Sequence, residues 1–188
     1  MPPKAKFTRE EIVDAAFEIA RKEGYSAITA RRLGADLGSS ARPIFSVFNS
    51  MEEVLECVRN KTVELFNSYI RKGLKDQGFK GSGIDYIQFA IDEPVLFREL
   101  FMTDLGVTVN LDTIMQNDDN YSLVIDTIMQ MYGITRELAV KLYRYMFIIS
   151  HGIATLCANH MCTFTEKEID EILTLGFTGI GMLLMKQK

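Results

Sequence analysis

Three side chains that can ligate a metal lie close together late in the sequence. Cys157, His160 and Cys162 belong to residue types that bind zinc or copper, and Cys157 and His160 stand three positions apart, so both could reach one ion from a helix. Structural zinc sites usually show two well-spaced ligand pairs, and both cysteines are also explained as buried apolar side chains. We therefore expect no bound metal and keep metal or redox sensing as an alternative.

Sequence motifs typical of nucleotide binding and of enzyme catalysis are missing from the sequence. Gly176, Gly179 and Gly181 fall inside a long helical pattern, whereas a nucleotide fingerprint places its glycines between a strand and a helix. No nucleophile stands at motif spacing from a base, and we find neither paired carboxylates in an apolar setting nor a phosphate-binding loop. We expect a protein that is not an enzyme and needs no cofactor.

A group of polar residues in the first fifty positions suits a surface that binds DNA. Ser39 and Ser40 are small hydrogen-bonding groups, and the forked guanidinium of Arg42 can bond a guanine edge in two places or contact a phosphate. Thr29 and Arg31, at the start of a preceding helix, could hold the sugar–phosphate backbone. Each residue alone is also explained as a solvated cap, so the elements around them decide the interpretation.

The first of these elements is a helix that begins at a capping box. Thr8 can accept a hydrogen bond from the amide of Glu11, whose carboxylate reaches back to the Thr8 amide. Apolar residues then repeat at helical spacing until Gly24, which ends the helix.

Two shorter helices are predicted to follow, joined by a tight turn. Thr29 can cap the second helix, and Gly38 supplies the positive φ that the turn needs. Ser39 or Ser40 then caps a third helix with Pro43 in its first turn, where a missing amide hydrogen costs little. Two short helices joined by such a turn, with a bracing helix before them, form a helix-turn-helix pattern.

These residues resemble the TetR/AcrR family of bacterial repressors. The resemblance covers roughly residues 8 to 60 and is carried by the segments TREEIVDAA (8–16), EGYSAITAR (23–31), LGSS (37–40) and IFSVFNSMEEV (44–54). It is thinner beyond, in EPVLFRELF (93–101) and HGIATL (151–156). The resemblance implies a homodimer that binds palindromic double-stranded operator DNA and releases it when a small effector binds. It also implies that Thr29 and the segment 39–49 contact DNA. Together with Arg31, which starts the second helix, the candidate DNA contacts are Thr29, Arg31, Ser39, Ser40, Ala41, Arg42, Phe45 and Asn49.

The sequence departs from the family pattern on the surface that should contact DNA. Family members commonly carry tyrosine at Phe45, histidine or tyrosine at Val47 and lysine at Met51, and a small residue at Pro43. The first three changes each remove a polar contact to phosphate. We expect weak or unusually selective DNA binding, and a dimeric ligand-binding module with lost DNA binding is the alternative.

Helical periodicity continues to the end of the chain, so we expect an all-α fold. A capping box of Ser50 and Glu53 opens a helix over residues 50–73, which would connect a DNA-binding domain over 1–49 to a ligand-binding and dimerisation domain over 74–188. Further predicted elements are a mobile polar joint over 73–83, helices over 84–91 and 95–102, a loop over 104–120, and helices over 121–132, 135–160 and 165–186.

The last two predicted helices are apolar over most of their circumference. A helix of this kind must be covered on two sides. Pairing both helices with their copies in a second subunit would cover them and would match a palindromic operator. The alternative is that both lie in the middle of the domain.

Many aromatic and methionine side chains of the second domain could line an adaptable pocket. Thioethers and flat rings suit an apolar or amphipathic small molecule, although packing explains most of them equally well. With the family resemblance, the candidates are Phe89, Phe97, Phe101, Met102, Met129, Phe147 and His151.

The composition fits a protein of the cytoplasm. Three cysteines without a visible signal peptide indicate free thiols, and no apolar stretch is long enough to span a bilayer. The net charge of −4 does not favour DNA binding, but residues 1–50 hold eight basic and six acidic side chains, which makes this part positive.

Overall fold

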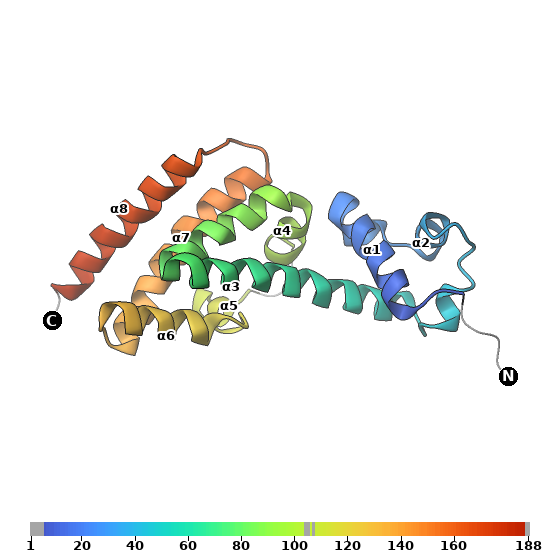
Figure 1. The fold of residues 1–188 in the computed structure, drawn as a ribbon, viewed down its shortest axis with the longest axis horizontal. Coiled ribbons are helices and arrows are strands. Elements are labelled where there is room, and N and C mark those ends of the chain that lie inside the picture. Colours follow the sequence, from blue (N-terminus) through green and yellow to red (C-terminus); the bar gives the residue numbers. More distant parts are fainter. Residues whose placement is uncertain (1–5, 104–105, 107, 187–188) are drawn as a thin grey trace. The chain divides into compact units, whose positions relative to one another are not determined.

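A computed structural model describes residues 6–103, 106 and 108–186, and within these ranges every regular element is a helix and none is a strand. The chain divides into two compact units. One comprises the described residues up to Leu65 together with Val95–Thr103, and the other comprises Phe66–Pro94 and the described residues from Gly106 onward. The described residues of both units form helices and the segments that join them (Figure 1).

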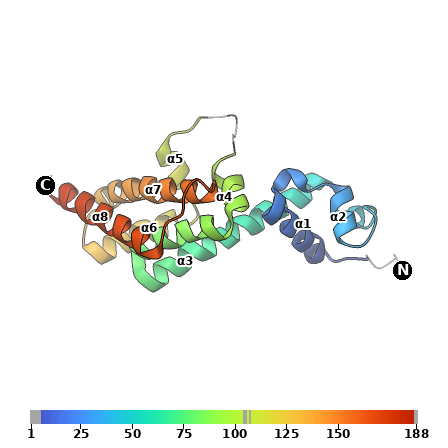
Figure 2. The same cartoon turned by 90° about the horizontal axis from the view of Figure 1, so that it is seen from above.

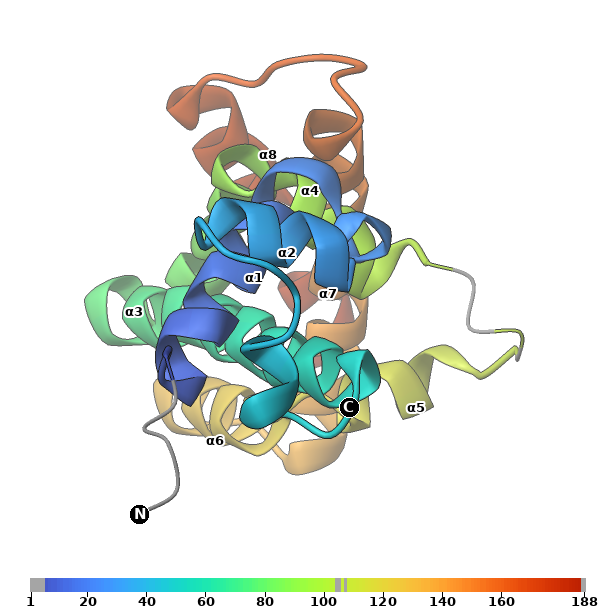
Figure 3. The same ribbon diagram turned by 90° about the vertical axis from the view of Figure 1, so that its right-hand side faces the viewer.

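The first unit is built around the predicted N-terminal helix. α1 (Arg9–Glu23) begins at the Thr8–Glu11 capping box, and its Gly24 cap has a φ of 87°. The 3₁₀ turn η1 (Tyr25–Ala27) follows, then α2 (Ala30–Asp36), capped by Thr29. α2 packs on α1 (Figure 3), and the unit is completed by the 3₁₀ turn η2 (Ile44–Ser46), the first part of α3 and α4 (Pro94–Phe101). Its core side chains include Ile12, Phe17, Ile19, Leu33, Ile44, Phe48, Val54, Val58, Leu96 and Phe97.

The second unit contains the remaining helices. α5 (Leu111–Gln116), α6 (Tyr121–Tyr132), α7 (Arg136–Ala158) and α8 (Glu166–Met185) follow the second part of α3. α7 packs on both α6 and α8, and α8 runs alongside α7 (Figures 1 and 2). A capping box of Thr165 and Glu168 opens α8. Part of the expected loop over 104–120 is helical, because Asn110 accepts the Thr113 amide and starts α5; residues 104, 105 and 107 of this loop lie outside the described residues.

The predicted polar joint over 73–83 is shorter than expected: α3 (Met51–Asp92) consists of two helices that meet at a kink whose non-helical residues are Gln77 and Gly78. Gly78 has φ 63° and ψ −146°, a conformation that is essentially confined to glycine. Across the kink a Cβ on Gly73 would lie 2.2 Å from the carbonyl oxygen of Gly81. The glycines therefore permit a close approach of backbones and do not mark a flexible loop.

This packing predicts opposite effects of the same substitution at two glycines. Gly73→Ala should lower the free energy of unfolding by about 1–3 kcal/mol, because the methyl group meets backbone that cannot move aside cheaply. Gly152→Ala, inside α7 with nothing within 4 Å of a Cβ, should raise it by about 0.5–1 kcal/mol. Denaturant unfolding monitored by circular dichroism measures both, and equal effects would contradict the close approach.

Candidate nucleic-acid interface and cavity

The segment after α2 is held against that helix by a contact between backbones. A Cβ on Gly34 would lie 2.8 Å from the carbonyl carbon of Ser40 and 2.9 Å from the amide nitrogen of Ala41. The amide of Ser39 donates to the Gly34 carbonyl over 2.8 Å, and Gly38 has a φ of 62°. A tight turn around Gly38, as predicted, therefore fixes where the next residues emerge.

The predicted third α-helix is replaced by overlapping turns that end in η2. The amide of Ile44 donates to the Ala41 carbonyl over 3.1 Å, and the amide of Val47 donates to the Ile44 carbonyl over 3.0 Å. These are bonds across three residues, the pattern of a 3₁₀ helix. Pro43 explains the difference, because it has no amide hydrogen and keeps the residue before it out of α geometry. The segment is thus a shorter helical turn than expected, anchored by the buried Ile44 and Phe48.

The structure places the predicted DNA contacts on the surface of the first unit. Thr29, Arg31, Ser40, Arg42, Phe45 and Asn49 are exposed, and Ser39 and Ala41 are partly exposed. Phe45 exposes 48% of its surface although it is a large apolar residue. An apolar ring beside small polar groups and a guanidinium can contact base edges and sugars.

The arginines of this surface differ in their availability. Arg32 is held by carboxylates of Glu23 and Asp36, at 2.8 and 3.2 Å. Within the described part of the chain, Arg31 and Arg42 have neither an ion pair nor a side-chain hydrogen bond. These two exposed cations are therefore free to meet an anion.

Asn49 and the start of α3 are held by the Glu53 carboxylate. The backbone and side-chain amides of Asn49 donate to Glu53 over 2.8 and 3.1 Å, and Arg9 pairs with the same carboxylate over 2.8 Å. The Asn49 backbone bond, then the Arg9 bond, lower the pKa of Glu53. The predicted capping box is only half formed: the Glu53 amide donates to Ser50, but the carboxylate bonds Asn49 instead of the Ser50 amide.

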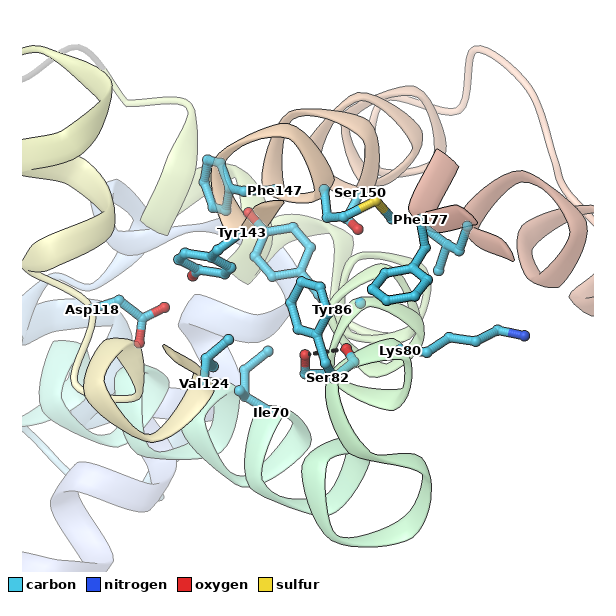
Figure 4. A pocket seen from close by; sticks show the side chains of 14 residues that line it. Ile70, Lys80, Ser82, Tyr86, Asp118, Val124, Tyr143, Phe147, Ser150 and Phe177 are labelled. Atoms are coloured by element: carbon cyan, nitrogen blue, oxygen red, sulfur yellow. Dashed lines mark hydrogen bonds between the residues drawn. The ribbon is translucent and has the colours of Figure 1, made fainter. Parts of the chain in front are cut away.

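The second unit contains a largely aromatic cavity (Figure 4). Its empty volume, which includes space open to solvent, is about 540 Å³. Its walls are provided by the kinked second part of α3, the turn before α6, and α6, α7 and α8. They carry Ile70, Phe79, Lys80, Ser82, Gly83, Tyr86, Asp118, Val124, Tyr143, Met146, Phe147, Ser150, Leu173 and Phe177.

Of the predicted ligand-binding residues, Phe147 alone lines this cavity. His151 lies behind it: its ring stacks on that of Phe147, and its Nδ1 is 2.9 Å from the Tyr86 hydroxyl. Burial lowers the pKa of His151, which favours the neutral ring. Phe89 is buried against Phe66. Phe97, Phe101 and Met102 belong to the first unit, and Met129 is outside the lining set.

Sequence reasoning missed most of the cavity wall. Tyr143, Met146, Phe147 and Ser150 repeat at spacings of three and four residues, so they share one face of α7. This spacing is a signal that the sequence contains, although the sequence interpretation above assigns the helix to dimerisation. Asp118 gave no local signal, because an aspartate among asparagines is typical of a turn.

The cysteine and histidine cluster at the end of α7 does not assemble a metal site. In the part of the chain that the structure describes, no three His, Cys, Asp or Glu side chains gather as a metal would require. Burial, and then the nearby Cys162, raise the pKa of the Cys157 thiol, which disfavours the thiolate that binds metals.

None of the described helices has the length and apolar character needed to cross a bilayer.

Comparisons with known proteins agree with this architecture. No family model matches the chain. An uncharacterized HTH-type transcriptional regulator of Bacillus subtilis (strain 168), YobS, is 23% identical over 197 residues, which cover 100% of this chain and 98% of that protein. The crystal structure of a TetR family transcription regulator from Marinobacter aquaeolei VT8 matches with a TM-score of 0.61 and 14% identity, over 90% of this chain and 93% of that one.

Both of these proteins are transcription regulators, as the sequence interpretation expected, and neither is described as an enzyme. This chain has the all-α fold of the TetR family of transcription regulators and resembles an HTH-type transcriptional regulator along its whole length.

Proposed function

We propose that this chain is a TetR-like transcription repressor that binds palindromic double-stranded operator DNA as a homodimer and is released by a small apolar or amphipathic ligand. The observation that carries the proposal is the exposed surface around η2. There Arg31 and Arg42 lack carboxylate partners in the described part of the chain, and the backbone contact at Gly34 fixes the presenting turn.

In DNA recognition, some residues would hold the sugar–phosphate backbone and others would contact the bases. Thr29 caps α2 by accepting the Arg32 amide over 3.2 Å. At this end of the helix, Arg31 and backbone amides would hold a phosphate. Arg42 and Ser40 would meet base edges in the major groove, and Phe45 would add an apolar contact. Because η2 is a single 3₁₀ turn and lacks a phosphate-binding tyrosine, fewer contacts are available than a longer recognition helix would give.

A second subunit would cover the exposed apolar face of α7 and α8. Leu175 and Leu183 of α8 are 73% and 64% exposed, and Ile148 of α7 is 52% exposed. Large apolar residues clustered in this way favour an interface. Two-fold pairing would present two η2 turns to half-sites roughly 34–36 Å apart, one turn of the duplex.

Coupling between ligand and DNA would run through α4. Within the first unit, the Glu99 carboxylate of α4 accepts the Tyr25 amide over 3.0 Å, directly after α1. α4 also follows, after the single residue Glu93, the part of α3 that brings Phe79 and Tyr86 to the cavity. A ligand that shifts this part of α3 would therefore pull on α4 and on the helices that carry the DNA contacts. The coupling must be reciprocal, so bound operator would weaken ligand binding by the same factor.

The DNA-binding proposal is tested by comparing three arginine variants. Arg42→Ala should weaken specific binding by about 1–3 kcal/mol, because a two-point base contact is lost, and Arg31→Ala should weaken it less specifically. Arg32→Ala is the matched control, because Glu23 and Asp36 already hold its guanidinium. The measurement is a mobility-shift assay with DNA flanking the protein's own gene, at two salt concentrations.

Two outcomes would count against this proposal. Equal affinity of the Arg42→Ala and unchanged proteins for every sequence would favour the alternative, a dimeric ligand-binding module without DNA recognition. Equal losses for the Arg32 and Arg42 variants would indicate general charge attraction without base reading.

The dimer is tested by introducing a charge on the exposed face of α8. Leu175→Glu should weaken self-association by at least about tenfold, because the carboxylate would be buried without a partner. Leu123→Glu on α6, where the leucine is 49% exposed, is the matched control and should leave the dimer intact. Sedimentation velocity measures both, and a monomeric unchanged protein, or equal behaviour of both variants, would contradict the interface.

A further inference from the structure

The wall of the cavity in the second unit offers several aromatic ring faces. The ring centroids of Phe79 and Phe177 lie 6.2 Å apart, those of Phe79 and Tyr143 6.3 Å apart, and those of Tyr86 and Phe147 5.9 Å apart. These three pairs meet edge to face, and all five of their rings belong to the wall of the cavity. The face of an aromatic ring carries negative potential and attracts cations.

No positive side chain points into this space among the described residues that line it. Lys80 is the single basic lining residue, and its ammonium pairs with Asp170 and points away from the cavity (Figure 4). Arg144 of α7 is engaged by both oxygens of Asp112, at 2.7 and 2.8 Å. A bound anion would therefore find no counter-ion here.

One carboxylate enters the aromatic wall, that of Asp118 just before α6. Its Oδ1 accepts the backbone amide of Asn120 over 2.7 Å and the side-chain amide over 3.2 Å, whereas Oδ2 has no hydrogen-bond donor in the described part of the chain. Figure 4 shows the carboxyl group pointing toward Tyr143 and Val124. Burial raises the pKa of Asp118, and its negative charge adds to burial in raising the pKa of Tyr86 and of Tyr143.

We propose that this cavity binds an amphipathic organic cation, with Asp118 as its counter-ion and the surrounding rings as its apolar and cation–π contacts. A lipophilic ammonium fits this chemistry, because it recovers the energy lost by burying the carboxylate while its apolar part fills the aromatic space. The inference deepens the proposed function, since it names the class of effector for the same cavity.

The competing explanation is that Asp118 serves only to form the turn before α6. Asp118→Asn separates the two roles, because the amide keeps an acceptor oxygen for the Asn120 amides but removes the charge. The matched control is Asp126→Asn. This exposed α6 carboxylate pairs with Arg136 and does not line the cavity.

The test is a calorimetric titration of the full-length protein with three probes of similar size. They are benzyltrimethylammonium, its neutral carbon isostere neopentylbenzene, and the anion phenylbutyrate. The unchanged protein should bind the cation at least about tenfold more tightly than the isostere. Asp118→Asn should reduce cation affinity about 10- to 100-fold and leave that of the isostere within about twofold. Asp126→Asn should change neither, and thermal unfolding should show both variants folded.

A negative result for the cation proposal can be distinguished from a negative result for the proposed DNA-binding function. Equal affinities for the cation and the isostere, or a cation affinity unchanged in Asp118→Asn, would overturn the cation proposal and leave the cavity as an effector site for neutral molecules. Tightest binding of phenylbutyrate would overturn it as well. If none of the three probes binds, the cation proposal falls, whereas the mobility-shift result with DNA still stands or falls on its own.

Discussion

The backbones at Gly34 and at Ser40–Ala41 approach so closely that no side chain fits between them. This contact sets the position of everything that follows it in the first unit. Gly38 turns the chain, Ile44 and Phe48 anchor it in the core, and the residues between them remain outside. The candidate DNA contacts are therefore presented by packing and turn geometry, although the presenting segment is barely helical.

A similar constraint shapes the second unit. The kink at Gly78 and the approach of Gly73 to Gly81 fold α3 sharply, so that Ile70 before the kink and Phe79 and Tyr86 after it reach the same cavity. α4 then follows this folded segment, and its Glu99 accepts the amide of Tyr25 in η1. The side chains that would sense a ligand and the helix that would report it are thus consecutive in the chain.

Local signals predicted much of the fold. Threonine caps at residues 8 and 29 and regular apolar spacing predicted the ends of most helices within a residue or two, because a capping side chain bonds the amide three positions further on. The prediction of a third α-helix was wrong because it relied on the helical spacing of the apolar residues. It gave too little weight to Pro43, which has no amide hydrogen for helical bonding. The joint over 73–83 was predicted too long, because glycines that allow two helices to pack closely look the same in sequence as glycines of a turn.

Of the two candidate sites, one could be predicted from local sequence and the other could not. The DNA surface was predictable because it lies within one short segment, and the structure leaves these residues exposed or partly exposed. The cavity was not, because Asp118, Tyr86 and Phe177 come from different elements and meet only after folding. Composition identified the right residue types for an apolar pocket, but only the fold selects which rings face it.

The central claim is that the turn after Gly38 enters the groove of a duplex. Hydrogen exchange measured by mass spectrometry, with and without DNA flanking the protein's own gene, tests it most directly. The account predicts that the DNA slows exchange in peptides covering residues 29–49 and leaves α6 unchanged. Binding of the DNA without any protection of residues 29–49 would contradict it.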